Sequence, residues 1–551
     1  MKGVIRVSED AKKSGFDLDR ILSQRISRRD LLKRGTAAGA IIGLGPLLAA
    51  CGGGTTTTTA AGGTTTTVGE VKKGGNLKIG LVGGGAQDTA DPHMSSFIPD
   101  DAINWCLFEG LLQYSADYTP EYLLAEDVSP NEDATVWTAK IKSDILWHDG
   151  KPLTADDVVF SFKRIVDPDN PLLGAAALGG LKSENIVKVD DMTVTFTFDE
   201  PNVVFKTDAL TQRLVHVVPV GFDPVNPIGT GPFKMKSFKP GEGFVLEAFA
   251  DYHGGAPYLD TLTFTEFEDP TARVNALLSG AVDAICELPP SQLPVIEATA
   301  GLVALNSKSG GWVPFCMNLS VKPFDDVRVR QAFRLIVDRQ QILDNAYSGV
   351  GWIGNDMYSP FDKGYPSDLP QRVQDLEKAK ELLAEAGYAD GLTVDLITSD
   401  AVGNGAVAQA EIFAEQAKGA GVTVNVQKVD SAVIYGDDYL SWGFSVDYWG
   451  LRNYLQQAAA GSTPDAPYNE THWENEEWYA LVQEAAKTAD DDKRNDLIRQ
   501  ANTIEYNEGG YIIPTFKNQL DAYSDKLVGI EQNEVIGIPL GRWRLHTVYF
   551  K

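Results

Sequence analysis

The spacing of hydrophobic and polar positions divides most of this chain into short strands and helices. Period-two alternation predicts strands, of which the clearest are NLKIGLV (76–82), VWTAKIK (136–142) and MTVTFTF (192–198). In the second half, LTVDLIT (392–398), a helical stretch through 406–420 and VTVNVQKV (422–429) follow one another as a β–α–β unit. Strands that alternate with helices predict an α/β fold, with parallel sheet in the second half.

Helical spacing and capping residues predict the helices between these strands. Thr154 is placed to cap a helix, with Asp156 and Asp157 in its first turn, and Gly387 is placed to end another. The remaining predicted helices are 105–112, one at the start of 269–285, a single helix over 325–343, one over 373–388, 432–440, WYALVQEAAKTAD and KRNDLIRQANTIEY. YIIPTF (511–516) is predicted to be a final buried strand.

The first fifty residues have the pattern of an export signal. Arg28 and Arg29 precede an uncharged run, 35–50, which is shorter than the ~20 apolar residues that span a bilayer. SRRDLLK (27–33) resembles a twin-arginine signal, and LAAC, which ends at Cys51, resembles a bacterial lipobox. We therefore expect 1–50 to be a twin-arginine-type lipoprotein signal and Cys51 to be acylated. The alternative is a general secretory signal with a chance cysteine.

The stretch that follows predicts a tether. Residues 51–75 contain the expected acylated cysteine followed by an almost uninterrupted Gly, Thr and Ala sequence that has no apolar period to bury. A flexible chain of this length has an r.m.s. reach of roughly 25–30 Å. Together, the signal and the tether predict a protein held at the outer face of a bacterial cell membrane.

Charge and cysteine content exclude several classes of protein. The formal net charge is −28, and removal of 1–50 makes the mature chain still more acidic, so a nucleic-acid partner is not expected. Cys106, Cys286 and Cys316 remain after Cys51; Cys286 and Cys316 form a disulfide, or all three are buried thiols. No CxxC or HExxH motif occurs, and we expect neither a metal nor another cofactor.

Several segments, in order, are similar to one known family. VWTAKIKSDILWHDGKPLTADDVVFSFKRIVDP (136–168) is the most specific, and NPIGTGPFKM, FDDVRVRQAFRLIVDRQQI and KAKELLAEAGY follow it. These segments resemble the extracytoplasmic solute-binding proteins of ABC importers, in the oligopeptide/dipeptide/nickel-binding family (family 5). The resemblance covers nearly all of 76–550.

The resemblance implies a periplasmic-binding-protein-like α/β fold, with two lobes, a hinge and a smaller inserted domain. Domain I is expected to combine 76–115, 229–310 and 518–551, with domain II at 116–228 and domain III at 311–517. A peptide or similar small solute would bind between domains I and III, which close by hinge motion. The implied partners are this ligand and the membrane subunits of an ABC permease with its cytoplasmic ATPase, and we expect a monomer.

FSVDYWGLRNYLQ (444–456) is the first candidate for ligand contact. The resemblance implies that peptide binders carry an acid here that pairs with the peptide's α-ammonium, but its counterpart falls at Asn453 or Tyr454. Arg452 is suited to an anionic group and Asp447 to a cationic one, whereas Tyr448 and Trp449 are suited to stacking. Alternatively, Asp447 and Arg452 form an internal ion pair and the aromatic residues belong to the core.

Two other segments supply further candidates. WVPFCMNL (312–319) resembles the strand that enters domain III, so Trp312 and Asn318 are candidates to face the cleft. SDAVGNG (399–405) is a strand-to-helix loop in which Asn404 and Ser399 either contact ligand or only cap the helix.

Two other functions remain as alternatives. A receptor for chemosensing or adhesion would use the same fold without transport. A secreted hydrolase would use paired carboxylates, but no GxSxG, SxxK or metal motif supports it, so we do not expect an enzyme.

Overall fold

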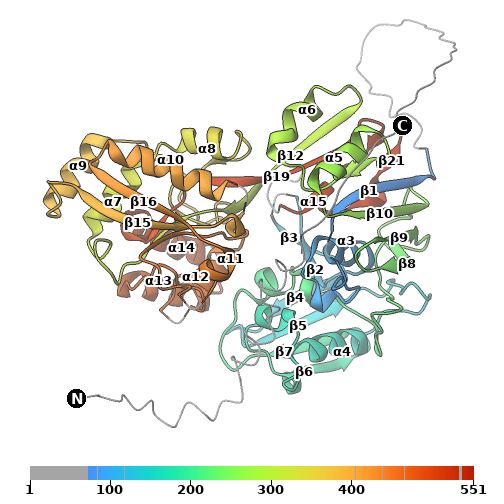
Figure 1. Cartoon of the computed structure of the whole chain (residues 1–551). Helices are drawn as coiled ribbons and strands as arrows, with labels where there is room; N and C mark the ends of the chain where they lie inside the picture. The colour runs from blue at the N-terminus through green and yellow to red at the C-terminus, as the bar shows by residue number, and fades with distance from the viewer. Residues whose placement is uncertain are drawn as a thin grey trace, which may run out of the picture. The chain divides into compact units, whose positions relative to one another are not determined.

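The computed structural model describes residues 72–551 except 84, 117, 404, 437, 465, 531 and 533–536 (Figure 1). The chain forms two units, 1–72 and 73–551, and all that follows concerns the second. The predicted signal segment, Cys51 with the tether as far as residue 71, and Asn404 lie outside the described residues.

An eight-stranded sheet contains the first strand of the described chain and strands from its middle and C-terminal parts. Its order is β12–β19–β11–β1–β10–β9–β8, with β14 paired to β19. The strand predicted at 76–82 is confirmed as β1, and Leu77, Ile79 and Leu81 on it are fully buried. The strands are β1 (Asn76–Val82), β8 (Phe233–Lys239), β9 (Gly243–Ala248), β10 (Thr261–Phe267), β11 (Ala284–Ile285), β12 (Leu302–Trp312), β14 (Trp352–Ile353) and β19 (Thr515–Ser524). The helices are α3 (Ile98–Leu107), α5 (Pro270–Leu278), α6 (Leu293–Glu297) and α15 (Pro539–Arg542).

A four-stranded antiparallel sheet of order β4–β5–β7–β6 follows in the sequence. Its strands are β4 (Ala125–Pro130), β5 (Val136–Ile141), β6 (Ile186–Asp190) and β7 (Thr193–Thr197). Helix α4 (Ala155–Ile165) begins at the predicted cap, where Asp157 accepts from the Thr154 backbone N–H. Two short pairs lie outside the larger sheets: β2 (Leu112–Tyr114) with β3 (Pro120–Tyr122), and β20 (Leu527–Val528) with β21 (Tyr549–Phe550).

A five-stranded mixed sheet of order β16–β15–β17–β13–β18 forms the second lobe. The predicted β–α–β unit is confirmed, since β15 pairs in parallel with β16 and α10 lies between them in sequence. The strands are β13 (Phe315–Met317), β15 (Leu392–Thr398), β16 (Val422–Lys428), β17 (Phe444–Val446) and β18 (Tyr511–Ile512). The helices are α7 (Val327–Ile336), α8 (Arg339–Ala346), α9 (Leu376–Glu385), α10 (Ala406–Lys418), α11 (Ser431–Ile434), α12 (Tyr454–Gly461), α13 (Glu476–Lys487) and α14 (Asp491–Glu508).

Two backbone crossings join the five-stranded sheet to the eight-stranded sheet (Figure 1). One runs from β12 to β13 through 313–314, and the other from β18 to β19 through 513–514. Each crossing ends in a proline, Pro314 or Pro514, which has no N–H for a sheet ladder and therefore interrupts it. The two crossings are the hinge of a two-lobed α/β fold.

Four predicted elements differ in the structure. The single strand predicted at 511–516 comprises β18 and the start of β19, separated by the crossing at 513–514. The helix predicted at 105–112 is wrong, because α3 covers Ile98–Leu107 and the apolar residues after it are extended. The helix predicted over 325–343 is two helices: Val337 leaves the helical conformation, and Asp338 then caps α8 by accepting from the Gln341 N–H. The predicted helix 432–440 is reduced to the single turn of α11.

Candidate functional site

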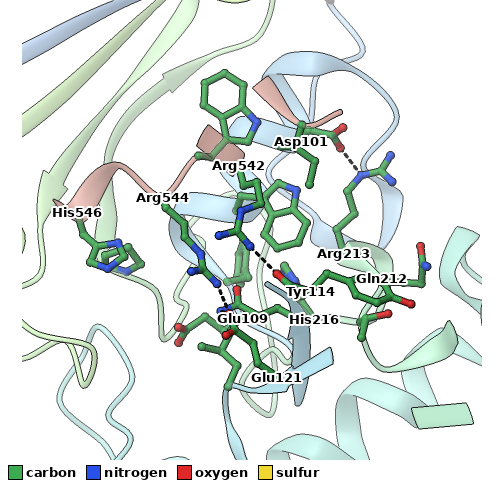
Figure 2. Close-up of a pocket in the computed structure, with 18 of the residues that line it drawn as sticks. Asp101, Glu109, Tyr114, Glu121, Gln212, Arg213, His216, Arg542, Arg544 and His546 are labelled. Atoms are coloured by element: carbon green, nitrogen blue, oxygen red, sulfur yellow. Dashed lines mark hydrogen bonds and ion pairs between the residues drawn. The ribbon is translucent and has the colours of Figure 1, made fainter. Parts of the chain in front are cut away.

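A pocket of about 410 Å³ opens beside the β2–β3 pair (Figure 2). Its wall combines α3 and the residues after it, the β2–β3 pair, residues 211–216 and the C-terminal stretch 538–546. The aromatic members of this wall include Trp105, Phe108, Tyr114, Tyr118, Tyr122 and Trp543. An aromatic wall with a few polar groups is typical of small-molecule sites, and this volume lies in their usual range.

Most charged side chains of the pocket are already engaged with one another. Figure 2 shows Arg213 bound to Asp101 and Arg544 bound to Glu121. Glu109 accepts from the Tyr252 hydroxyl at 2.8 Å and is 2.9 Å from the His253 ring nitrogen. A ligand charge placed among these groups would therefore have to displace an existing partner.

His216 in the pocket wall is a neutral imidazole. The Asn104 amide nitrogen donates to two backbone carbonyls, so its oxygen is the atom that faces His216 Nδ1 at 2.7 Å and accepts from it. Burial, together with the charge of Arg213 and the proximity of His93, lowers the pKa of His216 to about 3. His216 therefore contributes no charge to the pocket near neutral pH.

The C-terminal wall is built from a strained turn. Residues 540–543 all have left-handed backbone angles, with φ of 46° at Leu540, 68° at Gly541, 65° at Arg542 and 55° at Trp543. Three of these four are not glycine, and each such residue costs about 1–2 kcal/mol. Asp521 holds the turn by accepting from the Leu540 N–H at 2.7 Å, and Arg542 donates to the Tyr114 carbonyl at 2.6 Å (Figure 2). The strain is kept where it orients Arg542 and Trp543 toward the pocket.

Two acidic side chains, Asp208 and Asp362, accept hydrogen bonds from the adjacent residues Asn453 and Tyr454, and we call them the carboxyl pair. Asp208 is 5% exposed; its Oδ1 accepts from Thr207 at 2.9 Å and from the side-chain amide of Asn453. Its Oδ2 has no hydrogen-bond partner among the described residues. Asp362 Oδ2 accepts from the Tyr454 backbone N–H at 2.5 Å. Within the described part of the chain, neither carboxyl forms an ion pair.

The surroundings of the carboxyl pair disfavour negative charge. Burial raises the pKa of Asp208 to about 6 and that of Asp362 to about 8, and the charge of Asp208 adds to the rise at Asp362. The cation that acts on both is Arg494, but its guanidinium is bound to Asp491 and to the Thr488 carbonyl. At neutral pH the pair therefore retains a proton.

Two stacked tyrosines connect the carboxyl pair to the pocket. The rings of Tyr114 and Tyr118 lie 4.2 Å apart at 17° and belong to the pocket wall. The Tyr114 hydroxyl accepts from the Asn453 amide at 2.7 Å, and the nearby carboxyls add to the burial that raises the pKa of both phenols. The pocket and the carboxyl pair therefore share a wall.

The structure places the predicted aromatic residues in packing positions. Arg452 lies 5.0 Å from the centre of the Trp449 ring, and Trp449 is nearly parallel to Trp312 at 6.0 Å. Trp312 in turn lies nearly parallel to Tyr358, and Tyr358 to Tyr454, within one core cluster. From the stretch 444–456, Leu451 is the residue in the described pocket wall.

The other predicted residues also have partners within the protein. Asp447 accepts from the hydroxyls of Tyr435 at 3.0 Å and Tyr439 at 2.9 Å, and in the described residues it forms no ion pair with Arg452. Tyr448 is 37% exposed and Asp447 5%, as strand alternation predicts. Asn318 is buried and accepts from the Ser320 hydroxyl at 2.6 Å.

Asn453 is the predicted residue that reaches the site, through Asp208 and Tyr114. Asp208, Asp362 and the Tyr114–Tyr118 pair are not predicted, because these three places are far apart in the sequence and no local motif joins them.

Two further observations concern the described residues only. Cys106, Cys286 and Cys316 are buried free thiols there. No group of three or more potential ligating side chains in this part of the chain is arranged to hold a metal ion.

Within residues 72–551, no described helix has both the length and the apolar character needed to cross a bilayer.

Comparison with known proteins identifies the class. The family model described as the middle region of bacterial extracellular solute-binding proteins, family 5, matches residues 119–470. The chain belongs to this family, and it is an extracytoplasmic solute-binding protein of the ABC-transporter type.

Individual relatives extend the match over most of the chain. The dipeptide-binding protein of Escherichia coli is 27% identical over 504 residues, which cover 80% of this chain and 93% of that protein. The oligopeptide-binding protein AppA of Bacillus subtilis is 29% identical over 422 residues, 71% of this chain and 76% of that protein. Its structure with a nonapeptide has a TM-score of 0.68 at 25% identity and covers 88% of this chain and all of the other. HbpA2 from Haemophilus parasuis shows the same fold, with a TM-score of 0.77 at 24% identity, 87% of this chain and all of the other.

Proposed function

We propose that this protein is the lipid-anchored substrate-binding subunit of an ABC importer. It captures a peptide or similar small solute between its lobes and delivers it to a membrane permease. The export signal with LAAC at 48–51 and the Gly/Thr tether support the anchor. The names of the E. coli and B. subtilis relatives support a peptide-like solute.

The expected domain boundaries are part of this proposal. Strands β4 to β7 fall within 116–228, and β13 and β15 to β18 fall within 311–517. Strands β12 and β19 extend across the boundaries at 310 and 518 and adjoin the hinge crossings at 313–314 and 513–514. Solute would therefore bind where these parts of the chain meet.

One observation indicates which charge the solute carries. The carboxyl pair adjoins the pocket and has no cationic partner among the described residues. Peptide binders are expected to carry an acid near positions 453 and 454. Here, Asn453 and Tyr454 instead hold the carboxyls of Asp208 and Asp362 by hydrogen bonds. One buried acid, Asp208, and one partly buried acid, Asp362, both without a counter-charge, are stabilised by an ammonium or guanidinium group. We therefore assign the positively charged end of the solute to the carboxyl pair.

The test is a thermal-shift series with alanine peptides, from the dipeptide to the pentapeptide, and the same peptides acetylated at the amine. We expect free-amine peptides to raise the melting temperature by a few degrees at saturating concentration, because they bind only the native state. The acetylated peptides should have little effect. Equal stabilisation by both series would exclude an ammonium site at Asp208 and Asp362. The absence of any shift, with no peptide found by native mass spectrometry of the purified protein, would exclude a peptide solute.

A further inference from the structure

The carboxyl pair is held together by segments from different parts of the chain. Asn453 donates to a carboxyl 245 positions away, and Tyr454 to one 92 positions away. Gln456 adds a third contact by donating to the Asp208 carbonyl at 2.8 Å. The two acids therefore come together only in the folded arrangement of the segments around 208, 362 and 453–456.

The Asp208 and Asp362 carboxyls receive too few hydrogen bonds to stabilise a negative charge on each of them. Asp208 receives two side-chain hydrogen bonds on one oxygen and none on the other, within the described residues. Asp362 receives the Tyr454 N–H. Two neighbouring carboxyls in a poorly solvated site without a cation do not both ionise at neutral pH, so one keeps its proton there.

The other titratable groups that act on the pair do not change this outcome. Tyr114 and Tyr118 face it from the β2–β3 region, and both phenols remain protonated because burial and the two carboxyls raise their pKa. From α14, Arg494 acts from a distance, since its guanidinium is bound elsewhere. Thus the positive charge that would release the proton has to come from outside the protein.

We infer that solute binding at this site is an exchange reaction, in which the cationic group of the solute displaces a proton from the Asp208–Asp362 pair into solvent. The inference rests on the proposed ammonium site. No covalent bond in the solute changes: the O–H bond of the carboxyl breaks, the proton goes to water or buffer, and the carboxylate pairs with the cation. Capture would consequently weaken in acid and strengthen toward neutral pH.

The size of the effect follows from proton linkage. With pKa values of about 6 and about 8 in the empty site, the pair holds close to one proton at pH 7. Release of about one proton per solute corresponds to an affinity that rises about tenfold per pH unit. Below pH 6 the second carboxyl is also protonated and the dependence steepens. Above pH 8 the pair is fully ionised, and the affinity falls as the α-ammonium of the peptide, with a pKa of about 8, loses its proton.

The first experiment measures the proton in the empty protein. Infrared difference titration from pH 5 to 9 should show a protonated carboxyl band in the wild type that is lost as pH rises through about 8. Asp362→Asn should lower this band by one carboxyl and leave the part that comes from Glu505, whose pKa burial also raises to about 8. The matched control Asp496→Asn, at an exposed site on α14, should leave the band unchanged. If the band in Asp362→Asn is as large as in the wild type, or if the wild type shows no loss in this range, the inference is overturned.

The second experiment measures release during binding. Titration calorimetry at pH 7 in phosphate and in Tris, with the alanine peptide that gives the largest thermal shift, should report about one proton released per peptide. Asp208→Asn combined with Asp362→Asn should reduce that number to near zero, and each single variant serves if the double variant does not fold. Peptide binding without proton release overturns the exchange and leaves the importer function standing. If no peptide binds, the proposed function fails, and the infrared titration still decides whether the empty pair holds a proton.

Discussion

Asp356 anchors the loop that carries the Asp362 half of the carboxyl pair. Its side chain is fully buried; Oδ2 lies 2.7 Å from Arg339 Nη2 and 2.5 Å from Arg372 Nη1, and Oδ1 accepts from the Ile513 N–H at 2.9 Å. Ile513 lies in a hinge crossing, so this carboxylate ties the loop, two arginines and the hinge together.

Asp356→Asn removes the charge and little else. Asparagine has the same shape, and it tolerates the left-handed φ of 63° at this position better than other replacements. The substitution leaves the guanidinium of Arg339, which is 4% exposed, without its carboxylate. Removing one partner of a buried ion pair costs about 3–5 kcal/mol, which is a large part of the stability of most domains.

Urea unfolding followed by tryptophan fluorescence measures this loss as a lower midpoint. The matched control is Asp368→Asn, which removes the surface pair with Arg499, whose side chains are 68% and 42% exposed. We expect that control to lose less than about 1 kcal/mol. A loss at Asp356→Asn no larger than in the control would refute the reasoning. That result would mean that the backbone carbonyls which accept from Arg339 Nη1 at 3.3–3.4 Å stabilise the buried guanidinium without the Asp356 carboxylate.

The pH dependence gives an independent check. Burial by itself raises the pKa of Asp356, but the charges of Arg339, Arg372 and Arg334 outweigh it and hold the pKa below the usual 3.8. A depressed pKa in the folded state stabilises the protein above pH 3.8, and this stabilisation is lost as pH falls through the folded-state pKa. Asp356→Asn should therefore have a lower free energy of unfolding than the wild type at pH 7. The difference between the two proteins should become smaller as the pH is lowered.

Three further predictions test the anchor, the aromatic stack and a buried acid. Cys51→Ala should move the protein from the membrane fraction to the soluble fraction, and retention at the membrane would contradict the lipid anchor. Arg452→Ala should destabilise the protein by about 1–2 kcal/mol through its lost contact with Trp449; a several-fold loss of affinity for an anionic solute would instead place Arg452 in the binding site. Burial raises the pKa of Glu505 to about 8, so its contribution to stability is present below pH 4.5 and is lost as pH rises through 8. Urea titrations at several pH values should show that the free energy of unfolding of Glu505→Gln falls less steeply toward alkaline pH than that of the wild type. An equally steep fall would show that another group causes the loss.

Local sequence pattern was sufficient for most elements of the fold. The strand at 76–82, the cap at Thr154 and the β–α–β unit of β15, α10 and β16 follow from alternation and capping chemistry, which act within a few residues. The errors occurred where local signals compete. The apolar run after Leu107 continues the helical pattern, yet it is extended in the structure. The break at Val337 was missed because an Asp cap inside an amphipathic pattern resembles an ordinary exposed residue.

The sequence by itself determined the α/β character and the family, because periodicity and a long ordered motif are properties of neighbouring residues. Tertiary structure decided the site. The aromatic residues of 444–456 look suited to a ligand, but in the structure Trp449 and Trp312 stack in a core cluster. No acid stands at positions 453 and 454, and Asp208 and Asp362 reach Asn453 and Tyr454 from distant segments. Burial, hydrogen bonding and the lack of a nearby cation set the ionisation of those acids, and these are properties of the packed chain rather than of any stretch of it.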